Sequence, residues 1–308
     1  NPVFIDCDDS LCMDPIKLEK FCSEECDFID GILVNKKTNR KIRILVIVHV
    51  FGNMADMEKI MDIAKKYNLK VLEDATEALG TYYTEGRYKG KYAGTFGIMG
   101  TFSTFYSHHM ATMEGGVVCT DDEELYHILV CLRAHGWTRH LPKENKISNK
   151  SDNWFEESFR FLLPGYNVRP VEMSGVIGIE QLKKLPAFLE QRRKNAELFV
   201  SLFKDSKTFY IQKNVDDSSW FGFSLIIKPE SKVDRKDVVK KLEENGIDCR
   251  PIVTGDFTKN EVLKYFDYEI FGQVKNANYL DTKGLFVGNH QIDLTQEIKH
   301  LYNVLKEF

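Results

Sequence analysis

The sequence predicts an α/β fold with a mainly parallel sheet flanked by helices, followed by a smaller α+β unit. An apolar, β-branched run at residues 42–50 indicates a strand that is covered on both faces. A stretch of helical periodicity follows it, and residues 69–74 form a second apolar run. The chain of 308 residues is 43% hydrophobic, which suffices for one large or two ordinary domains.

The helix between these two runs is predicted from its spacing. Asp56 precedes it as a candidate N-cap. Its apolar residues recur at i, i+3, i+4 and i+7: Met57, Ile60, Met61 and Ala64. Strand, helix and strand in this order predict a right-handed parallel crossover. Asp74 is then expected at a strand's carboxyl end, the sheet edge where ligands bind in open parallel sheets.

The next segment combines turns and short strands. Residues 80–100 contain six glycines and predict a loop or hairpin that returns to a strand over 100–106. Another strand is expected after Gly115 and Gly116. Thr120 and Glu123 resemble a capping box, which opens a helix that stops at Gly136. The expected buried face of this helix consists of Leu125, Ile128, Leu129 and Leu132.

The second half of the chain changes character. Residues 141–158 are polar and predict a surface loop, and Pro170 opens an apolar helix that Pro186 is expected to interrupt. A strand at 221–227 and a helix at 234–245 follow. We therefore expect two domains, a large one over 1–200 and a small C-terminal one over 201–308.

Charge and cysteine content exclude several classes of partner. The 42 Lys and Arg and 46 Asp and Glu give a net charge of −4 without a basic patch, so nucleic acid is not expected. The longest apolar run is about half of a membrane span, so we expect a soluble protein. No export signal is visible, and seven cysteines without a C-x-x-C pair favour reduced thiols in the cytoplasm. Cys22 and Cys26 lack the usual metal-ligand spacing, so no metal is expected.

Polar segments gather at the predicted ligand edge. Asp74 is either a solvated loop acid or a partner for a protonated ring nitrogen. His108 or His109 either packs under a loop or moves a proton near neutral pH. Ser103 either binds phosphate or caps a turn. Turn chemistry explains the segments 114–116 and 165–170 as well as ligand binding does.

In this order and spacing, these segments resemble the DegT/DnrJ/EryC1/StrS aminotransferases, which are fold-type I pyridoxal-phosphate enzymes acting on nucleotide-linked sugars. The resemblance is strong over residues 1–200 and fainter beyond. It implies the aspartate aminotransferase fold and a homodimer. The matching segments are HVFGNMAD (49–56), LEDATEALG (72–80), GTFS (100–103), EGG (114–116), TDDEEL (120–125), LRAHG (132–136) and GYNVR (165–169).

The resemblance also implies roles for single residues. Asp74 would keep the pyridine nitrogen of the cofactor protonated, and Ser103 would bind the cofactor phosphate. Glu77 stands where relatives carry His or Gln near the ring. Asn167 would reach a phosphate across the dimer interface. Arg250 and His290 are candidates for contacting the sugar nucleotide or a glutamate carboxylate.

Position 108 departs from the family pattern. The family has a lysine five residues after the serine, which bonds to the cofactor and later moves a proton; here the residue is His108, and no lysine occurs between Lys91 and Lys143. Imidazole can move the proton but cannot form that bond. The sequence therefore resembles the branch that holds pyridoxamine phosphate untethered, of which colitose-pathway 3-dehydratases are the nearest type.

This branch removes the C3 hydroxyl of a nucleotide-linked 4-keto-6-deoxyhexose in deoxysugar and surface-polysaccharide biosynthesis, and L-glutamate restores the pyridoxamine form. Two alternatives stay open: an aminotransferase without a lysine tether, and a degenerate relative that acts as a binding or regulatory partner. Some related dehydratases use an iron–sulfur cluster held partly by a C-x-C pair, which this sequence lacks. Relatives carry a phosphate-binding glycine loop upstream of Asn1, so we expect the N-terminal part of the family fold to be absent.

Overall fold

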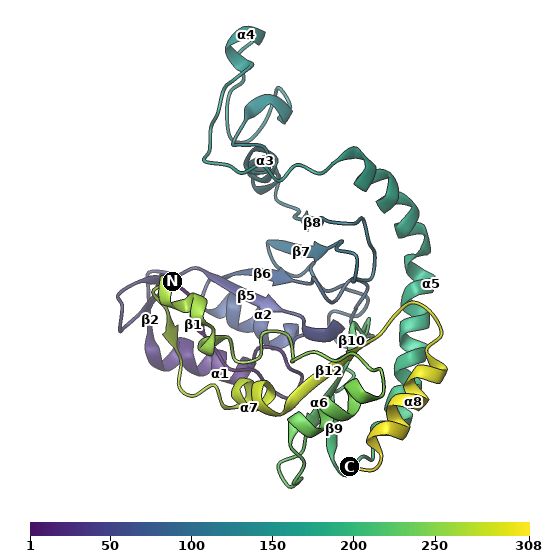
Figure 1. The fold of residues 1–308 in the computed structure, drawn as a ribbon. Coiled ribbons are helices and arrows are strands. Elements are labelled where there is room, and N and C mark those ends of the chain that lie inside the picture. Colours follow the sequence, from purple (N-terminus) through teal and green to yellow (C-terminus); the bar gives the residue numbers. More distant parts are fainter.

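Two separate hydrophobic cores organise the chain in the computed structural model, which describes residues 1–308 (Figure 1). The first contains 22 buried residues between Cys12 and Phe96. The second contains 16 buried residues between Ala196 and Leu305. A domain boundary at residue 200 stays a prediction, because helix α5 (Glu172–Phe203) runs across it unbroken.

The central sheet contains the predicted crossover. Its strands, in spatial order, are β5 (Ile44–Val48), β6 (Lys70–Asp74), β7 (Met99–Ser103) and β8 (Gly116–Cys119). The first three are parallel, and β8 is antiparallel to β7. Helix α2 (Met57–Lys66) connects β5 to β6, so the expected strand, helix and parallel strand are confirmed.

Helix α2 forms where its capping and apolar residues place it. The Asp56 side chain accepts the Lys59 amide at 3.1 Å, which satisfies one free N–H of the first turn. Met57, Ile60 and Ala64 are buried in the first core. Residues of strand β5 alternate between exposed and buried, so the strand is covered only on the face that packs against the first core. The expectation of a strand covered on both faces is therefore wrong within this chain.

Smaller elements surround the first core. Strand β1 (Val3–Phe4) pairs with β11 (Glu269–Ile270) in parallel, which ties the start of the chain to its C-terminal part. The other elements near the start are α1 (Pro15–Lys20), the π-helical turn η1 (Phe21–Glu25), the antiparallel strands β2 (Cys26–Ile29), β3 (Ile32–Asn35) and β4 (Lys41–Ile42), and the 3₁₀ turn η2 (Val50–Gly52).

The second core lies between an antiparallel sheet and helices. Its strands have the order β12 (Gly284–Gly288), β10 (Gly222–Ile227) and β9 (Phe209–Ile211). Helices α6 (Arg235–Glu244) and α8 (Thr295–Leu305) and the end of α5 contribute side chains to this core. The same part of the chain contains α7 (Lys275–Lys283) and the 3₁₀ turns η4 (Phe257–Lys259) and η5 (Glu261–Tyr265). The strand and helix expected at 221–227 and 234–245 are confirmed within one residue.

Helix α3 (Glu123–Leu132) differs from the expectation at both ends and on its buried face. Asp122, rather than Thr120, caps it by accepting the Leu125 amide, and it ends four residues before Gly136. Its buried residues are His127, Val130 and Cys131. The expected face was wrong because α3 packs against the segment that follows it, including Leu141, rather than against a sheet.

Helix α5 continues through Pro186, so the expected interruption is wrong. Proline removes one backbone hydrogen bond, and burial of Leu185 and Leu189 on either side of Pro186 favours the continuous helix. The first half of α5 exposes Met173, Val176, Ile179 and Leu182. Before α5, the chain forms an arm that projects from the sheet with α3, η3 (Thr138–His140) and α4 (Trp154–Glu157) (Figure 1).

No helix has both the length and the apolar character to span a membrane. All seven cysteines are free. Cys22 and Cys26 lie in the first core, where burial raises the pKa of Cys22 to about 12 and that of Cys26 to about 11. Both side chains are therefore core thiols.

Candidate active site

Asp74 lies at the carboxyl end of β6, as predicted. In the sheet register it stands between Val48 of β5 and Thr101 of β7. Its side chain is partly buried and accepts one hydrogen bond, from the Thr76 amide at 3.1 Å. A carboxylate with a single weak partner at this edge retains the capacity to bind a cationic group.

Glu73, the preceding residue, points to the opposite face and is fully buried. Its carboxylate accepts hydrogen bonds from His49 Nε2 at 3.0 Å and from three backbone amides: Gly94 at 2.8 Å, Phe96 at 2.5 Å and Gly97 at 2.7 Å. Burial alone raises the pKa of Glu73, but His49 and the amides outweigh it and hold that pKa below its usual value. Glu73 is thus a structural carboxylate.

A glycine and a histidine tautomer complete this network. A Cβ on Gly97 would lie 2.1 Å from the Val71 carbonyl oxygen, so only glycine lets the loop approach β6 closely enough to reach Glu73. His49 Nδ1 accepts the Ala55 amide at 3.1 Å. The His49 proton therefore resides on Nε2 and is donated to Glu73. Sequence reasoning missed this pair, although strand alternation places Glu73 on the face of Val71.

Glu77 lies one turn beyond Asp74. Its Oε2 accepts the Phe51 amide at 2.8 Å. Burial raises the pKa of Glu77 to about 7, the Phe51 bond opposes this rise, and the charge of Asp74 adds to it. The Glu77 carboxyl group therefore carries a proton in a large fraction of molecules at neutral pH.

Ser103 ends β7 at the same edge of the sheet, two residues after the partner of Asp74. Its hydroxyl accepts the Phe105 amide at 3.1 Å, which caps the turn that leads to His108. This observation supports the turn-capping role. A phosphate contact by Ser103 stays a prediction.

His108 follows this turn, partly buried. Its Nδ1 is buried without a partner, which leaves Nε2 available to a reactant. Burial lowers the pKa of His108, the Arg192 charge lowers it further, and Asp74 opposes both. The ring is therefore neutral near pH 7 and is suited to accept a proton.

His109, the adjacent histidine, is fully buried, and its Nε2 donates to the Ser219 carbonyl at 3.2 Å. Burial lowers the pKa of His109 well below its usual value. Of the two histidines, His109 fills the packed role and His108 is the candidate for proton transfer.

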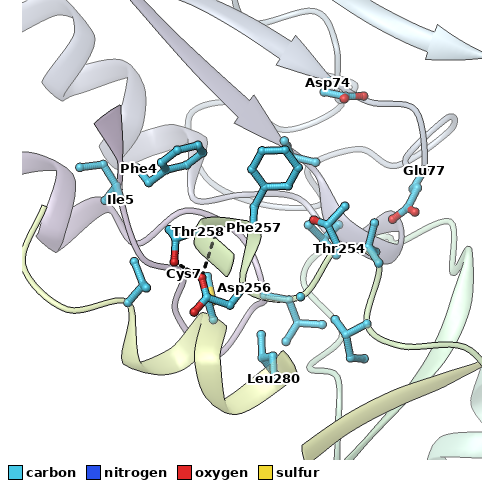
Figure 2. Close-up of a pocket in the computed structure, with 18 of the residues that line it drawn as sticks. Phe4, Ile5, Cys7, Asp74, Glu77, Thr254, Asp256, Phe257, Thr258 and Leu280 are labelled. Atoms are coloured by element: carbon cyan, nitrogen blue, oxygen red, sulfur yellow. Dashed lines mark hydrogen bonds between the residues drawn. The ribbon is translucent and has the colours of Figure 1, made fainter. Parts of the chain in front are cut away.

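A cavity of about 360 Å³ lies beside the two acids. Figure 2 shows Asp74 and Glu77 at its edge, with Thr254 and Leu280 of the C-terminal part below them in this view. Most of its other walls are apolar. The Asp74 carboxylate can accept a hydrogen bond from a cationic ring nitrogen, Glu77 adds a carboxyl group that can carry a proton, and the apolar walls suit the faces of a flat ring. These residues therefore fit a protonated pyridine ring.

The remaining predicted residues lie elsewhere. Asn167 is exposed on the arm and accepts a hydrogen bond from Arg169 Nε at 3.0 Å. Arg250 is exposed, and its guanidinium donates to the Cys249 carbonyl at 2.9 Å. His290 lies on the chain after β12 and is exposed as a whole residue. Partial burial of its ring, and then the Arg192 charge, lower the pKa of His290. None of these three residues lines the cavity beside Asp74.

Arg192 was not predicted, although a local signal for it exists. Its side chain is 1% exposed and donates to the carbonyl oxygens of Trp220, Phe221 and Asn289. The buried residues Leu189, Ala196 and Phe199 stand three residues before, four after and seven after it. This helical spacing places Arg192 on the buried face of α5.

The chain is similar to several known proteins. GDP-4-keto-6-deoxy-D-mannose 3-dehydratase of Yersinia pseudotuberculosis is 58% identical over 281 residues, which cover 91% of this chain and 70% of that protein. The Escherichia coli enzyme of this name, with bound hydrated PLP, has a TM-score of 0.89 and 52% identity over 98% of this chain and 73% of that one.

A structure of GDP-4-keto-6-deoxymannose 3-dehydratase with a trapped PLP–glutamate geminal diamine gives a TM-score of 0.89 at 52% identity, and covers 98% of this chain and 74% of that one. These structures share the fold-type I architecture expected from the motifs. The DegT/DnrJ/EryC1/StrS aminotransferase family model matches residues 1–304. The chain therefore belongs to the DegT/DnrJ/EryC1/StrS aminotransferase family.

Proposed function

We propose that this protein removes the C3 hydroxyl of GDP-4-keto-6-deoxy-D-mannose with a pyridoxal or pyridoxamine phosphate cofactor. The observation that carries the proposal is that a neutral histidine, His108, stands where the family's lysine is expected, so that no covalent bond to the cofactor can form there. The chain is also 58% identical to a dehydratase of this substrate. The reaction belongs to deoxysugar biosynthesis. A cytoplasmic location stays a prediction.

When bound, the cofactor supplies an electron sink next to the substrate carbon that reacts. Asp74 would hold the ring nitrogen, because its carboxylate has only one backbone partner. Glu77 would lie near the ring, and Ser103 would contact the phosphate. Asp74 stabilises the protonated ring, since a nearby negative charge raises the pKa of a cationic acid.

His108 performs the proton transfers. Its neutral Nε2 would take a proton from the methylene carbon of the cofactor and then, as an imidazolium, would donate it to the departing C3 hydroxyl, so that water leaves. The lowered pKa of His108 suits both steps, because the ring starts unprotonated and its conjugate acid gives the proton up readily. Unlike lysine, imidazole does not become covalently fixed to the cofactor.

The site includes a second substrate and a second subunit. L-Glutamate, which forms the adduct trapped in one related structure, would supply the amino group. The protein would act as a homodimer, in which the exposed Asn167 of one subunit reaches the cofactor phosphate of the other. Arg250 and His290 would contact the sugar nucleotide or the glutamate carboxylate.

The test replaces His108 with asparagine. His108→Asn is expected to lower dehydration about a hundredfold or more, because the proton acceptor is lost, while the affinity for pyridoxamine phosphate is kept. Mass spectrometry of the sugar product measures the loss of water, and fluorescence titration measures cofactor binding. The control His300→Asn changes an exposed histidine bonded to Asn245 in the C-terminal part. Normal turnover by His108→Asn, or a 4-amino sugar as the wild-type product, contradicts the proposal.

A further inference from the structure

The imidazole of His108 rests on a side chain from the C-terminal part of the molecule. The ring centroids of His108 and Phe221 are 5.0 Å apart at an interplanar angle of 43°. Phe105, from the turn itself, lies in an edge-on arrangement, with its ring centroid 6.0 Å from that of His108. No hydrogen bond holds the His108 ring, so these aromatic contacts set its orientation.

Phe221 is held at both of its peptide groups. Its amide donates to the Phe51 carbonyl at 3.1 Å, and its carbonyl accepts Arg192 Nη1 at 3.4 Å. The Phe51 amide in turn donates to Glu77. One continuous set of contacts therefore connects Arg192 through Phe221 to His108 on one side and to Glu77 on the other.

Arg192 is an unusual anchor, because it is a buried cation bonded only to carbonyl oxygens. No carboxylate lies within ion-pair distance of it. Carbonyl dipoles compensate its charge only in part, so its field extends to neighbouring groups. The charged groups that face His108 are Arg192 from α5 and Asp74 from β6.

We propose that Phe221 is a positioning residue for the His108 imidazole, and that Arg192 fixes Phe221 by bonding to its carbonyl oxygen. The positive charge of Arg192 adds to the effect of burial, which is the larger cause of the neutral state of the His108 ring. This inference rests on the proposed function for its catalytic meaning. The contacts lie within this one chain, so they can be tested on the protein alone. A movement of the C-terminal part of the molecule would shift the proton acceptor.

The first test is a carbon-detected NMR titration of the histidine rings in the cofactor-free protein. In Arg192→Gln, the His108 midpoint is expected to move to higher pH, because the neighbouring positive charge is gone. Arg193→Gln is the matched control: it removes the next cation on α5, which pairs with Asp217 at 2.9 Å, and should leave His108 unchanged. An equal or absent shift in the two variants overturns the role of Arg192.

The second test concerns Phe221. In Phe221→Leu, the His108 ring is expected to gain mobility in carbon relaxation experiments, and kcat should fall about tenfold or more with KM and cofactor affinity unchanged. Phe221→Tyr, which keeps the aromatic surface, should behave as wild type. Unchanged ring mobility and kcat in Phe221→Leu overturn the proposal.

These readouts keep the two proposals apart. If circular dichroism shows that Arg192→Gln does not fold, the two Phe221 variants decide whether Phe221 positions His108. If the wild-type protein shows no dehydration, the proposed function fails, while the NMR arms still test the positioning of His108.

Discussion

Two adjacent acids, Glu73 and Asp74, lie on opposite faces of β6 at its carboxyl end and differ in burial and in the number of hydrogen bonds they accept. Glu73 is completely buried and has four donors around its carboxylate, whereas Asp74 borders the cavity and has one. The same contrast separates His49, bonded at both ring nitrogens, from His108, bonded at neither. Within these two pairs, Glu73 and His49 are satisfied by the chain and stabilise the fold, whereas Asp74 borders the cavity and His108 is left available to a reactant.

Glu73→Gln should break the first half of this comparison and give the largest effect. The amide cannot accept from four donors, so the variant leaves buried N–H groups without partners and is expected to lose about 3 to 5 kcal/mol of unfolding free energy. Urea unfolding measures this loss. Glu58→Gln is the control, because the half-buried Glu58 carboxylate accepts one hydrogen bond, from the Arg87 amide.

The pH dependence of stability checks the same assignment. The pKa of Glu73 is lowered on folding, so its contribution is present above the unfolded value and is lost as the pH falls through the folded value. The unfolding free energy of the wild type should therefore fall below about pH 4.3, and that of Glu73→Gln should fall less. Parallel curves contradict a structural, ionised Glu73.

Asp74→Asn should give the reverse result. The side chain makes one hydrogen bond that asparagine can keep, so stability should change by less than about 0.5 kcal/mol. Turnover should fall about a hundredfold to a thousandfold, because the negative charge that stabilises the protonated ring is lost. Steady-state kinetics and thermal unfolding of one preparation measure both. Asp56→Asn is the control: it makes the same substitution away from the cavity, at a helix N-cap where asparagine can still cap.

Local patterns were sufficient to predict the edge of the sheet at which Asp74 and the candidate site lie. The apolar spacing of α2 and the runs in β5 and β6 place Asp74 at a strand end without knowledge of any distant residue. Motif order then singled out Ser103 and His108. These predictions depend on segments whose periodicity is strong over ten residues or fewer.

The contacts of His109 and Arg192 were missed because they join residues far apart in the chain. His109 meets Ser219 and Arg192 meets Asn289 across intervals of 110 and 97 residues, which no local periodicity records. The buried face of α3 and the continuity of α5 through Pro186 were wrongly predicted because tertiary packing decides both. Strand alternation, applied to Glu73 and Asp74 separately, would have assigned them to opposite faces.

Glu77 is intermediate between Glu73 and Asp74, because it is substantially buried but accepts only one hydrogen bond. Glu77→Gln tests this intermediate case. The pKa of Glu77 is raised to about 7 by burial, so the folded state binds the proton more tightly than the unfolded state does. Its ionisation therefore costs stability, and the cost develops as the pH rises from about 4.5 towards 7. Glutamine, which is always neutral, can still accept the Phe51 amide.

The wild type and Glu77→Gln should accordingly be equally stable at pH 4, and the variant should be more stable at pH 8. The displaced pKa sets an upper limit of about 3 kcal/mol, which water at the cavity edge reduces to about 1 to 2 kcal/mol. Thermal unfolding from pH 4 to pH 8 measures the difference. A gap of the same size at both ends of this range would mean that Glu77 is ionised throughout, which would place it with Asp74 rather than between the two acids of β6.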